Sequence, residues 1–134
     1  MLAIKGKASR QKKERMACCK VECKLAISES DFMSAVIDLG HLYGWRIAHF
    51  RPGLSQSGRY LTAVQADGAG FPDLVLVRQN NVGTATLIIL ELKSQKGRLS
   101  EAQKEWLAVL DKVPGVVARC ARPADWDEIA EMLK

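Results

Sequence analysis

Residues 71–93 read FPDLVLVRQNNVGTATLIILELK, and this stretch decides the fold of the chain. Two apolar runs, 71–78 and 86–93, flank a short turn that contains Asn and Gly, which is the pattern of a β-hairpin. The consecutive apolar residues at 87–90 indicate that the second strand is central in its sheet. Charged side chains nevertheless occur at the ends of both runs, and a buried charge needs a partner or a metal ion.

Before the hairpin, the sequence predicts one helix and one strand. The helix runs from Ser28 to Tyr43, because Ser28 and Asp31 match a capping box and apolar residues then recur on one face. Residues 45–50 alternate as they do in a strand. Residues 51–70 are rich in Gly, Ser and Gln, so we expect mainly a long loop, of the kind that is often functional.

Beyond the hairpin, the pattern continues as helix, strand and helix. Ser100 and Gln103 form a second capping box, so a helix begins there. The apolar run 116–120 predicts a short strand, and Asp125 with Glu128 matches the cap of a last helix. The whole order predicts an α/β fold with an αβββαβ core, in which helices flank one mixed central sheet.

Positive charge is concentrated at the N-terminus of this 134-residue chain, whose net charge is +5. Residues 1–24 hold eight Lys or Arg and two Glu, whereas the rest holds 12 basic and 13 acidic residues. This division predicts a basic tail at 1–24 and a single domain at 25–134. Such a tail favours polyanions, above all the phosphate backbone of DNA; a solubilising terminus is the alternative.

The sequence predicts neither a membrane protein nor a secreted one. Its longest apolar run is far too short to span a bilayer, and its basic start lacks the apolar core of a signal peptide. We expect a cytoplasmic protein, associated with the nucleoid, or lying in the host cytoplasm if it is viral. Reduced thiols are therefore expected at Cys18, Cys19, Cys23 and Cys120. A zinc site is the alternative, but no matching second pair of cysteines exists.

Three charged residues on the hairpin carry the functional prediction. Glu91 and Lys93 are two residues apart on one strand, so they point to the same face, and the pairing of the hairpin brings Asp73 near Glu91. Two close carboxylates repel each other unless a cation lies between them. Asp73, Glu91 and the carbonyl of Leu92 would offer oxygen ligands to Mg²⁺, for which Mn²⁺ would substitute.

Lys93 beside such a metal would help to deprotonate or orient a water, which suits hydrolysis of a phosphodiester. The alternative is an ordinary hairpin with a surface salt bridge between Glu91 and Lys93.

The motifs also resemble a known family. G-F-P-D at 70–73, followed by E-L-K at 91–93, resembles the PD-(D/E)xK nuclease motif. The wider pattern of GFPDLVLVR, LELKSQKGRLSEAQKEWLAVL and ARPADWDEI resembles the VRR-NUC domain, the virus-type replication-repair nuclease branch of that superfamily. The resemblance covers about residues 28–131 and implies a restriction-endonuclease-like fold with metal-dependent nuclease activity.

By this resemblance, Asp73 and Glu91 are metal-binding carboxylates and Lys93 is the catalytic lysine. Gln103 resembles a glutamine that supports the site, and Glu29 resembles a first-helix acid that completes the cluster around the metal. Taken alone, Gln103 also fits a simple helix cap, and Glu29 fits a favourable position in a helix dipole.

Further residues are candidates for contact with the substrate. They are four loop cations and one histidine: Arg51, Arg59, Lys96, Arg98 and His49. Such cations either hold phosphates or are simply solvated, and a single histidine is more often structural. Trp106 and Trp126 stand at helical spacing and are predicted to lie in the core.

We therefore expect a Mg²⁺-dependent, structure-specific DNA endonuclease of the Holliday-junction resolvase type, acting in DNA repair. A four-way junction has two-fold symmetry, so paired cuts need two sites and imply a homodimer. The alternatives are a nuclease directed to flaps or forks, and a non-catalytic DNA-binding module.

Overall fold

The computed structural model describes residues 27–50, 53–54, 60–61 and 66–134. The basic tail, three of the cysteines, Arg51 and Arg59 therefore lie outside the described residues, and the predictions made for them stand as predictions. The elements follow in the order α1 (Glu29–Leu42), β1 (Arg46–His49), β2 (Gly53–Leu54), β3 (Tyr60–Leu61), β4 (Leu74–Gln79), β5 (Ala85–Leu92), α2 (Glu101–Leu110), β6 (Val116–Ala121), the 3₁₀ turn η1 (Pro123–Asp125) and α3 (Trp126–Leu133).

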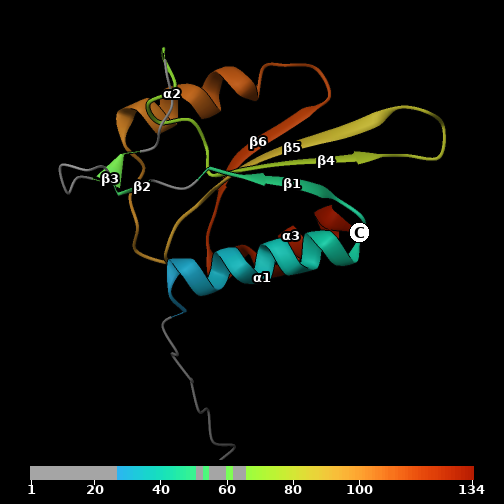
Figure 1. Ribbon diagram of the computed structural model, residues 1–134, viewed down its shortest axis with the longest axis horizontal. Coiled ribbons are helices and arrows are strands. Elements are labelled where there is room, and N and C mark those ends of the chain that lie inside the picture. The colour runs from blue at the N-terminus through green and yellow to red at the C-terminus, as the bar shows by residue number, and fades with distance from the viewer. Residues whose placement is uncertain (1–26, 51–52, 55–59, 62–65) are drawn as a thin grey trace, which may run out of the picture.

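The main sheet has four strands in the order β1-β4-β5-β6 (Figure 1). β4 pairs antiparallel with both β1 and β5, whereas β6 pairs parallel with β5. A parallel pair needs a crossover connection, and α2 supplies it. The predicted α/β fold with a mixed sheet is confirmed, and the predicted hairpin is the pair β4–β5.

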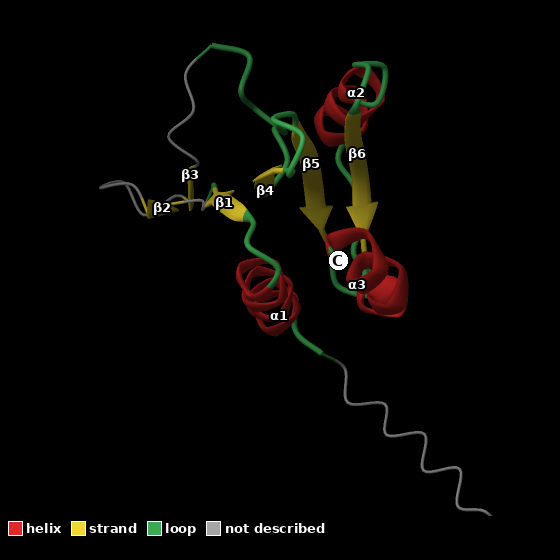
Figure 2. Cartoon of the chain, turned by 90° about the vertical axis from the view of Figure 1, so that its right-hand side faces the viewer, coloured by secondary structure: helices red, strands yellow, loops and turns green. Residues whose placement is uncertain are grey.

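Helices cover both faces of this sheet: α1 and α3 lie on one face and α2 on the other (Figures 1 and 2). The larger cluster of buried apolar residues fills the α1–α3 side, and it includes Leu90 and Leu92 of β5. The smaller cluster lies under α2 and includes Ile89. Because side chains alternate along a strand, Glu91 and Lys93 point to the α2 side, as Ile89 does.

Strand β4 is shorter at its start than predicted. The apolar run begins at Phe71, but the N–H of Phe71 donates to Gly68 O in a turn, and Pro72 has no N–H to offer. The strand therefore begins at Leu74, and Asp73 lies immediately before it. The long loop predicted over 51–70 contains a small antiparallel pair, β2–β3, which its composition did not predict.

The two predicted caps of the outer helices differ in detail from expectation. Ser28 caps α1 by accepting from the Asp31 N–H at 3.0 Å, and its hydroxyl donates to the Asp31 carboxylate at 2.7 Å. Asp125 is the N-cap residue of α3, as predicted, but its side chain makes no capping hydrogen bond to that helix. Asp125 accepts from the Arg122 N–H at 2.9 Å instead, which caps η1. Glu128 pairs instead with Arg119 of β6, whose Nη2 donates to Glu128 Oε2 at 2.9 Å.

The predicted core position is confirmed for one of the two tryptophans. Trp126 is partly buried and packs against the larger core cluster, as predicted. Trp106 is also only partly buried, and its indole N–H donates to Asp67 O and Ala69 O, both at 3.2 Å. Its ring meets Phe71 edge to face, with centroids 5.1 Å apart. The prediction of a core role for Trp106 is therefore wrong, because the indole N–H needs acceptors and finds them in the loop before β4.

No helix among the described residues is long and apolar enough to cross a membrane.

Candidate active site

The charged residues of the hairpin meet at the end of the two central strands. The registered pairs of β4 and β5 include Leu74 opposite Leu90, which places Asp73 beside Glu91. One oxygen of Asp73 accepts from the backbone N–H of Leu92 at 3.0 Å. Asp73 is thereby tied to the strand that carries Glu91, and the predicted proximity of the two carboxylates is confirmed.

Glu91 is fully buried, and its two oxygens have different surroundings. Oε1 accepts from Lys93 Nζ at 2.6 Å and from Gln103 Nε2 at 2.5 Å. Oε2 is buried and has no hydrogen-bond partner among the described residues. An unsatisfied buried carboxylate oxygen is costly, and either protonation of Glu91 or a bound cation would offset that cost.

The pKa of Glu91 reports the same imbalance. This pKa is raised from 4.5 to about 7, chiefly by burial and then by the charge of Asp73 and a hydrogen bond with it, while the hydrogen bond and charge of Lys93 oppose this rise. The positive charge of Lys93 therefore does not fully compensate the two carboxylates.

Lys93 follows β5 directly, and its backbone N–H donates to Ala121 O at 3.0 Å, which extends the pairing of β5 with β6. Its side chain is 15% exposed. Burial lowers the pKa of Lys93, but the hydrogen bond and charge of Glu91 outweigh burial, so the pKa is raised. The predicted alternative of a surface salt bridge is wrong in its location: the ion pair exists, but its carboxylate is wholly buried.

Gln103 combines the two roles considered for it. Its side-chain oxygen accepts from the backbone N–H of Ser100 at 2.9 Å, and its backbone N–H donates to the Ser100 hydroxyl at 3.2 Å. These two hydrogen bonds complete the capping box of α2. The same side chain donates from Nε2 to Glu91. Because the cap holds the amide oxygen, the amide nitrogen is directed at the carboxylate.

Glu29 lies near the site but makes a different contact. It is exposed at the start of α1, and its Oε2 accepts from the backbone N–H of Ser94 at 3.1 Å. The described residues hold no group of three or more His, Cys, Asp or Glu placed to bind a metal ion. Its role as a metal ligand thus stays a prediction, whereas its hold on the loop after Lys93 is observed.

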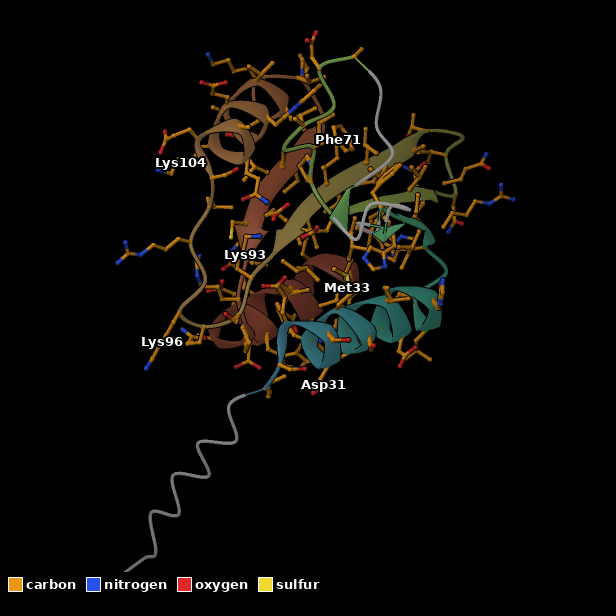
Figure 3. All side chains as sticks on the ribbon, turned by 60° about the vertical axis from the view of Figure 1, so that its left-hand side comes forward. Asp31, Met33, Phe71, Lys93, Lys96 and Lys104 are labelled. Carbon is orange, nitrogen blue, oxygen red and sulfur yellow. The ribbon has the colours of Figure 1, made fainter. Side chains whose placement is uncertain are left out.

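The candidate substrate contacts lie in two places. Lys96 and Arg98 are exposed in the connection between β5 and α2, and Lys96 points away from the body of the protein, whereas Lys93 is directed inward (Figure 3). His49 is half-buried on β1, opposite Leu74. Contact of these residues with a substrate stays a prediction.

A family model described as the VRR-NUC domain matches residues 48–122. This chain belongs to the VRR-NUC family. Membership makes the protein a nuclease of the PD-(D/E)xK type, for which DNA is the expected substrate. Comparisons with curated proteins and with solved structures found no match. The four-stranded mixed sheet between helices is consistent with a restriction-endonuclease-like core.

The matched part of this VRR-NUC domain contains Asp73, Glu91, Lys93 and Gln103, while Glu29 precedes it. Its candidate donors are carboxylate and carbonyl oxygens, which suit a hard ion such as Mg²⁺ better than zinc, which takes nitrogen and sulfur. Glu91 fits this requirement, because its buried Oε2 has no hydrogen-bond partner among the described residues and its carboxyl lies beside that of Asp73.

Gly70, the first residue of the G-F-P-D motif of this VRR-NUC domain, has a packing role that the sequence did not predict. It adopts φ +82°, and an added Cβ would lie 2.6 Å from Ala102 Cβ and 2.8 Å from the backbone nitrogen of Gln103. The segment before Asp73 thus packs directly on the backbone of α2 beside Gln103. A glycine next to a motif is the only signal for this contact in the sequence.

Proposed function

We propose that this VRR-NUC protein is a Mg²⁺-dependent, structure-specific DNA endonuclease of the Holliday-junction resolvase type. The observation that carries the proposal is the buried Glu91 oxygen that has no hydrogen-bond partner among the described residues, on a carboxylate adjacent to Asp73. A non-catalytic DNA-binding module has no need for two adjacent carboxylates, one of them fully buried, since burial and mutual repulsion cost stability.

Asp73, Oε2 of Glu91 and the carbonyl of Leu92 are the groups proposed to hold the divalent ion. When bound, the ion supplies Lewis acidity for hydrolysis of a phosphodiester and neutralises charge on the phosphate. Gln103 keeps Oε1 of Glu91 engaged, which leaves Oε2 as the oxygen proposed to bind the ion. Mn²⁺ is expected to substitute for Mg²⁺, because it accepts the same oxygen ligands.

Lys93 contributes a positive charge to this site. Its raised pKa keeps the amine protonated, so it is suited to orient a water or stabilise negative charge on a phosphate oxygen. Deprotonation of the water by Lys93 would require a neutral amine, and the neighbouring Glu91 disfavours that state. We therefore assign Lys93 an electrostatic and orienting role.

The metal requirement has a direct test. Mg²⁺ or Mn²⁺ should support cleavage, whereas Ca²⁺ should bind and support it poorly, because its coordination is looser and it acidifies water less. Binding is measured by calorimetry and cleavage with labelled DNA. Undiminished cleavage in excess EDTA would refute the metal-dependent mechanism.

The preference of the nuclease for one DNA structure over another is tested with a panel of labelled DNAs: a four-way junction, a flap, a fork and a linear duplex. Paired symmetric cuts in the junction need two active sites, and one chain offers one candidate site, so we propose a two-fold homodimer on branched DNA. Sedimentation of the free and DNA-bound protein checks this assembly. A monomer that prefers flaps or forks would replace the resolvase assignment with that of a flap or fork nuclease.

A further inference from the structure

The loop at 94–99, between β5 and α2, begins directly after Lys93 and is anchored by contacts from three other elements. Each contact involves one hydrogen bond: from the Ser94 N–H to Glu29 on α1 at 3.1 Å, from the Ala124 N–H on η1 to the Gln95 side chain at 3.1 Å, and from Arg122 Nη2 to Gly97 O at 3.0 Å. These bonds fix the path of the backbone that follows the candidate catalytic lysine.

Gly97 is the point where this loop folds back onto Lys93. A Cβ added to Gly97 would lie 3.2 Å from Lys93 Cβ and 3.3 Å from Lys93 Cδ. The backbone of Gly97 therefore covers the aliphatic stem of Lys93. Anything that moves Gly97 also changes the space in which that stem is held, because close-packed atoms transmit small displacements.

Arg122 holds Gly97 from a position just beyond the end of β6. It follows β6 directly, next to Ala121, whose carbonyl accepts the backbone N–H of Lys93. Its guanidinium is half-buried, with Nη2 bonded to Gly97 O and Nη1 bonded to Cys120 Sγ at 3.4 Å. A planar guanidinium held through two nitrogens has a fixed orientation, which lysine does not reproduce.

We propose that Arg122 is a positioning residue for Lys93, acting through the carbonyl of Gly97. The hydrogen bond from its guanidinium to Gly97 O holds the loop against the stem of Lys93, which keeps the ammonium on Oε1 of Glu91. This inference rests on the proposed role of Lys93 in cleavage. Arg122 itself does not touch the reacting atoms in this assignment.

The first test measures the position of Lys93 without any cleavage. The intact, metal-free protein is treated with a limiting amine-acylating reagent, and modification is quantified by mass spectrometry. Exposed Lys96 serves as the internal reference for buried Lys93. We expect Lys93 to react slowly in the natural protein and several-fold faster, relative to Lys96, in Arg122→Ala.

Gly97→Ala perturbs the same contact from the other side, with Arg122 intact. Its Cβ would force the stem of Lys93 to shift by a few tenths of an ångström, so the acylation of Lys93 should also accelerate. This variant carries the test if Arg122→Ala does not fold. The matched control is Arg119→Ala, which removes an arginine of β6 whose side chain pairs with Glu128 of α3.

The second test separates positioning from substrate binding. In Arg122→Ala, kcat should fall roughly tenfold while KM for DNA changes by less than about twofold, because misplacement of a catalytic group affects the chemical step. Arg119→Ala should leave both constants unchanged.

The proposal would be overturned if Lys93 were acylated at the same rate in Arg122→Ala and in Gly97→Ala as in the natural protein. An Arg122→Ala protein whose only defects are a higher KM and a weaker salt dependence of binding would also overturn it, since that pattern identifies a phosphate contact. If the natural protein cleaves no DNA, the proposed nuclease function fails, but the acylation rates still decide whether Arg122 positions Lys93.

Discussion

At Glu91, a single carboxylate has one satisfied oxygen and one that lacks a hydrogen-bond partner within the described part of the chain. Lys93 and Gln103 both donate to Oε1, whereas Oε2 is buried, and the carboxyl group as a whole lies beside Asp73. Burial of such an atom costs stability in the metal-free protein, but the same burial strengthens its electrostatic interaction with a bound cation. This arrangement leads to one prediction about cleavage and one about the pH dependence of stability.

The first residue-scale prediction concerns cleavage. Asp73→Asn, Glu91→Gln and Lys93→Ala should each abolish DNA cleavage, with circular dichroism showing an intact fold. Asp73→Asn keeps an oxygen for the Leu92 N–H but removes repulsion from Glu91, so its metal-free form should unfold at a higher temperature than the natural protein. Full cleavage by Lys93→Ala or by Glu91→Gln would exclude the proposed site.

The second residue-scale prediction concerns pH. The pKa of Glu91 is about 7 in the folded protein and 4.5 as its ordinary value. Below 4.5 both the folded and unfolded states hold this proton, and above it the unfolded state loses the proton first. The contribution of Glu91 to folding stability is therefore full below 4.5 and is lost as the pH rises through 7.

Urea unfolding of the metal-free protein across this pH window measures the effect. The free energy of unfolding should fall less steeply with pH in Glu91→Gln than in the natural protein, because glutamine does not titrate. Saturating Mg²⁺ should restore stability above pH 7 in the natural protein, since it binds only the folded state. Parallel pH profiles for the two metal-free proteins would contradict the assignment of this titration to Glu91.

At the scale of elements, α2 is the link between the two halves of the site. Its first turn directs Gln103 at Glu91, and its Trp106 holds the loop that leads into Asp73 through Asp67 O and Ala69 O. The same loop touches the backbone of α2 at Gly70. The spacing between the strand ends and the helix thus depends on contacts outside the sheet.

Two glycines test this spacing as a matched pair. Gly70 and Gly83 adopt nearly the same φ, +82° and +83°, but only Gly70 has atoms within 4 Å of an added Cβ. Gly83→Ala should cost about 1–2 kcal/mol of stability from backbone strain alone and leave cleavage unchanged. Gly70→Ala adds a collision with α2, so it should cost more and slow cleavage.

Thermal unfolding and single-turnover cleavage measure the two effects. Equal losses of stability and equal cleavage rates in both variants would mean that contact of Gly70 with α2 has no part in arranging the site.

At the scale of the whole molecule, charge is divided between the basic segment 1–24 and a nearly neutral remainder. We predict that deletion of residues 1–24 weakens DNA binding and flattens its salt dependence. Each lost phosphate contact should reduce the slope of log K against log salt by roughly one unit. Turnover of bound substrate should change little, because the proposed catalytic residues all follow this segment.

Titration of a four-way junction with the full-length and truncated proteins, at two salt concentrations, measures both quantities. Equal affinities and equal slopes would remove the basic segment from the mechanism and favour its alternative role as a solubilising terminus.

The sequence by itself determined the features that depend on neighbours along the chain. Alternation on β5 places Glu91 and Lys93 on one face, and the Asn- and Gly-containing turn predicts the hairpin that brings Asp73 close. The capping box of Gln103 is equally local, since its partner is three residues away. Together with the motif, these patterns predicted the fold class, the family and the location of the charged cluster.

Only the tertiary structure decided which distant groups complete the cluster. The amide of Gln103 reaches Glu91 across a gap of twelve residues, Arg122 reaches Gly97 across twenty-five, and Trp106 binds a loop nearly forty residues earlier. Such contacts depend on how α2 packs on the sheet and on the parallel pairing of β5 with β6, and periodicity along the chain contains no information about either. The same reason explains why Trp106 was misplaced: helical spacing indicates a face, whereas the neighbouring loop determines what covers it.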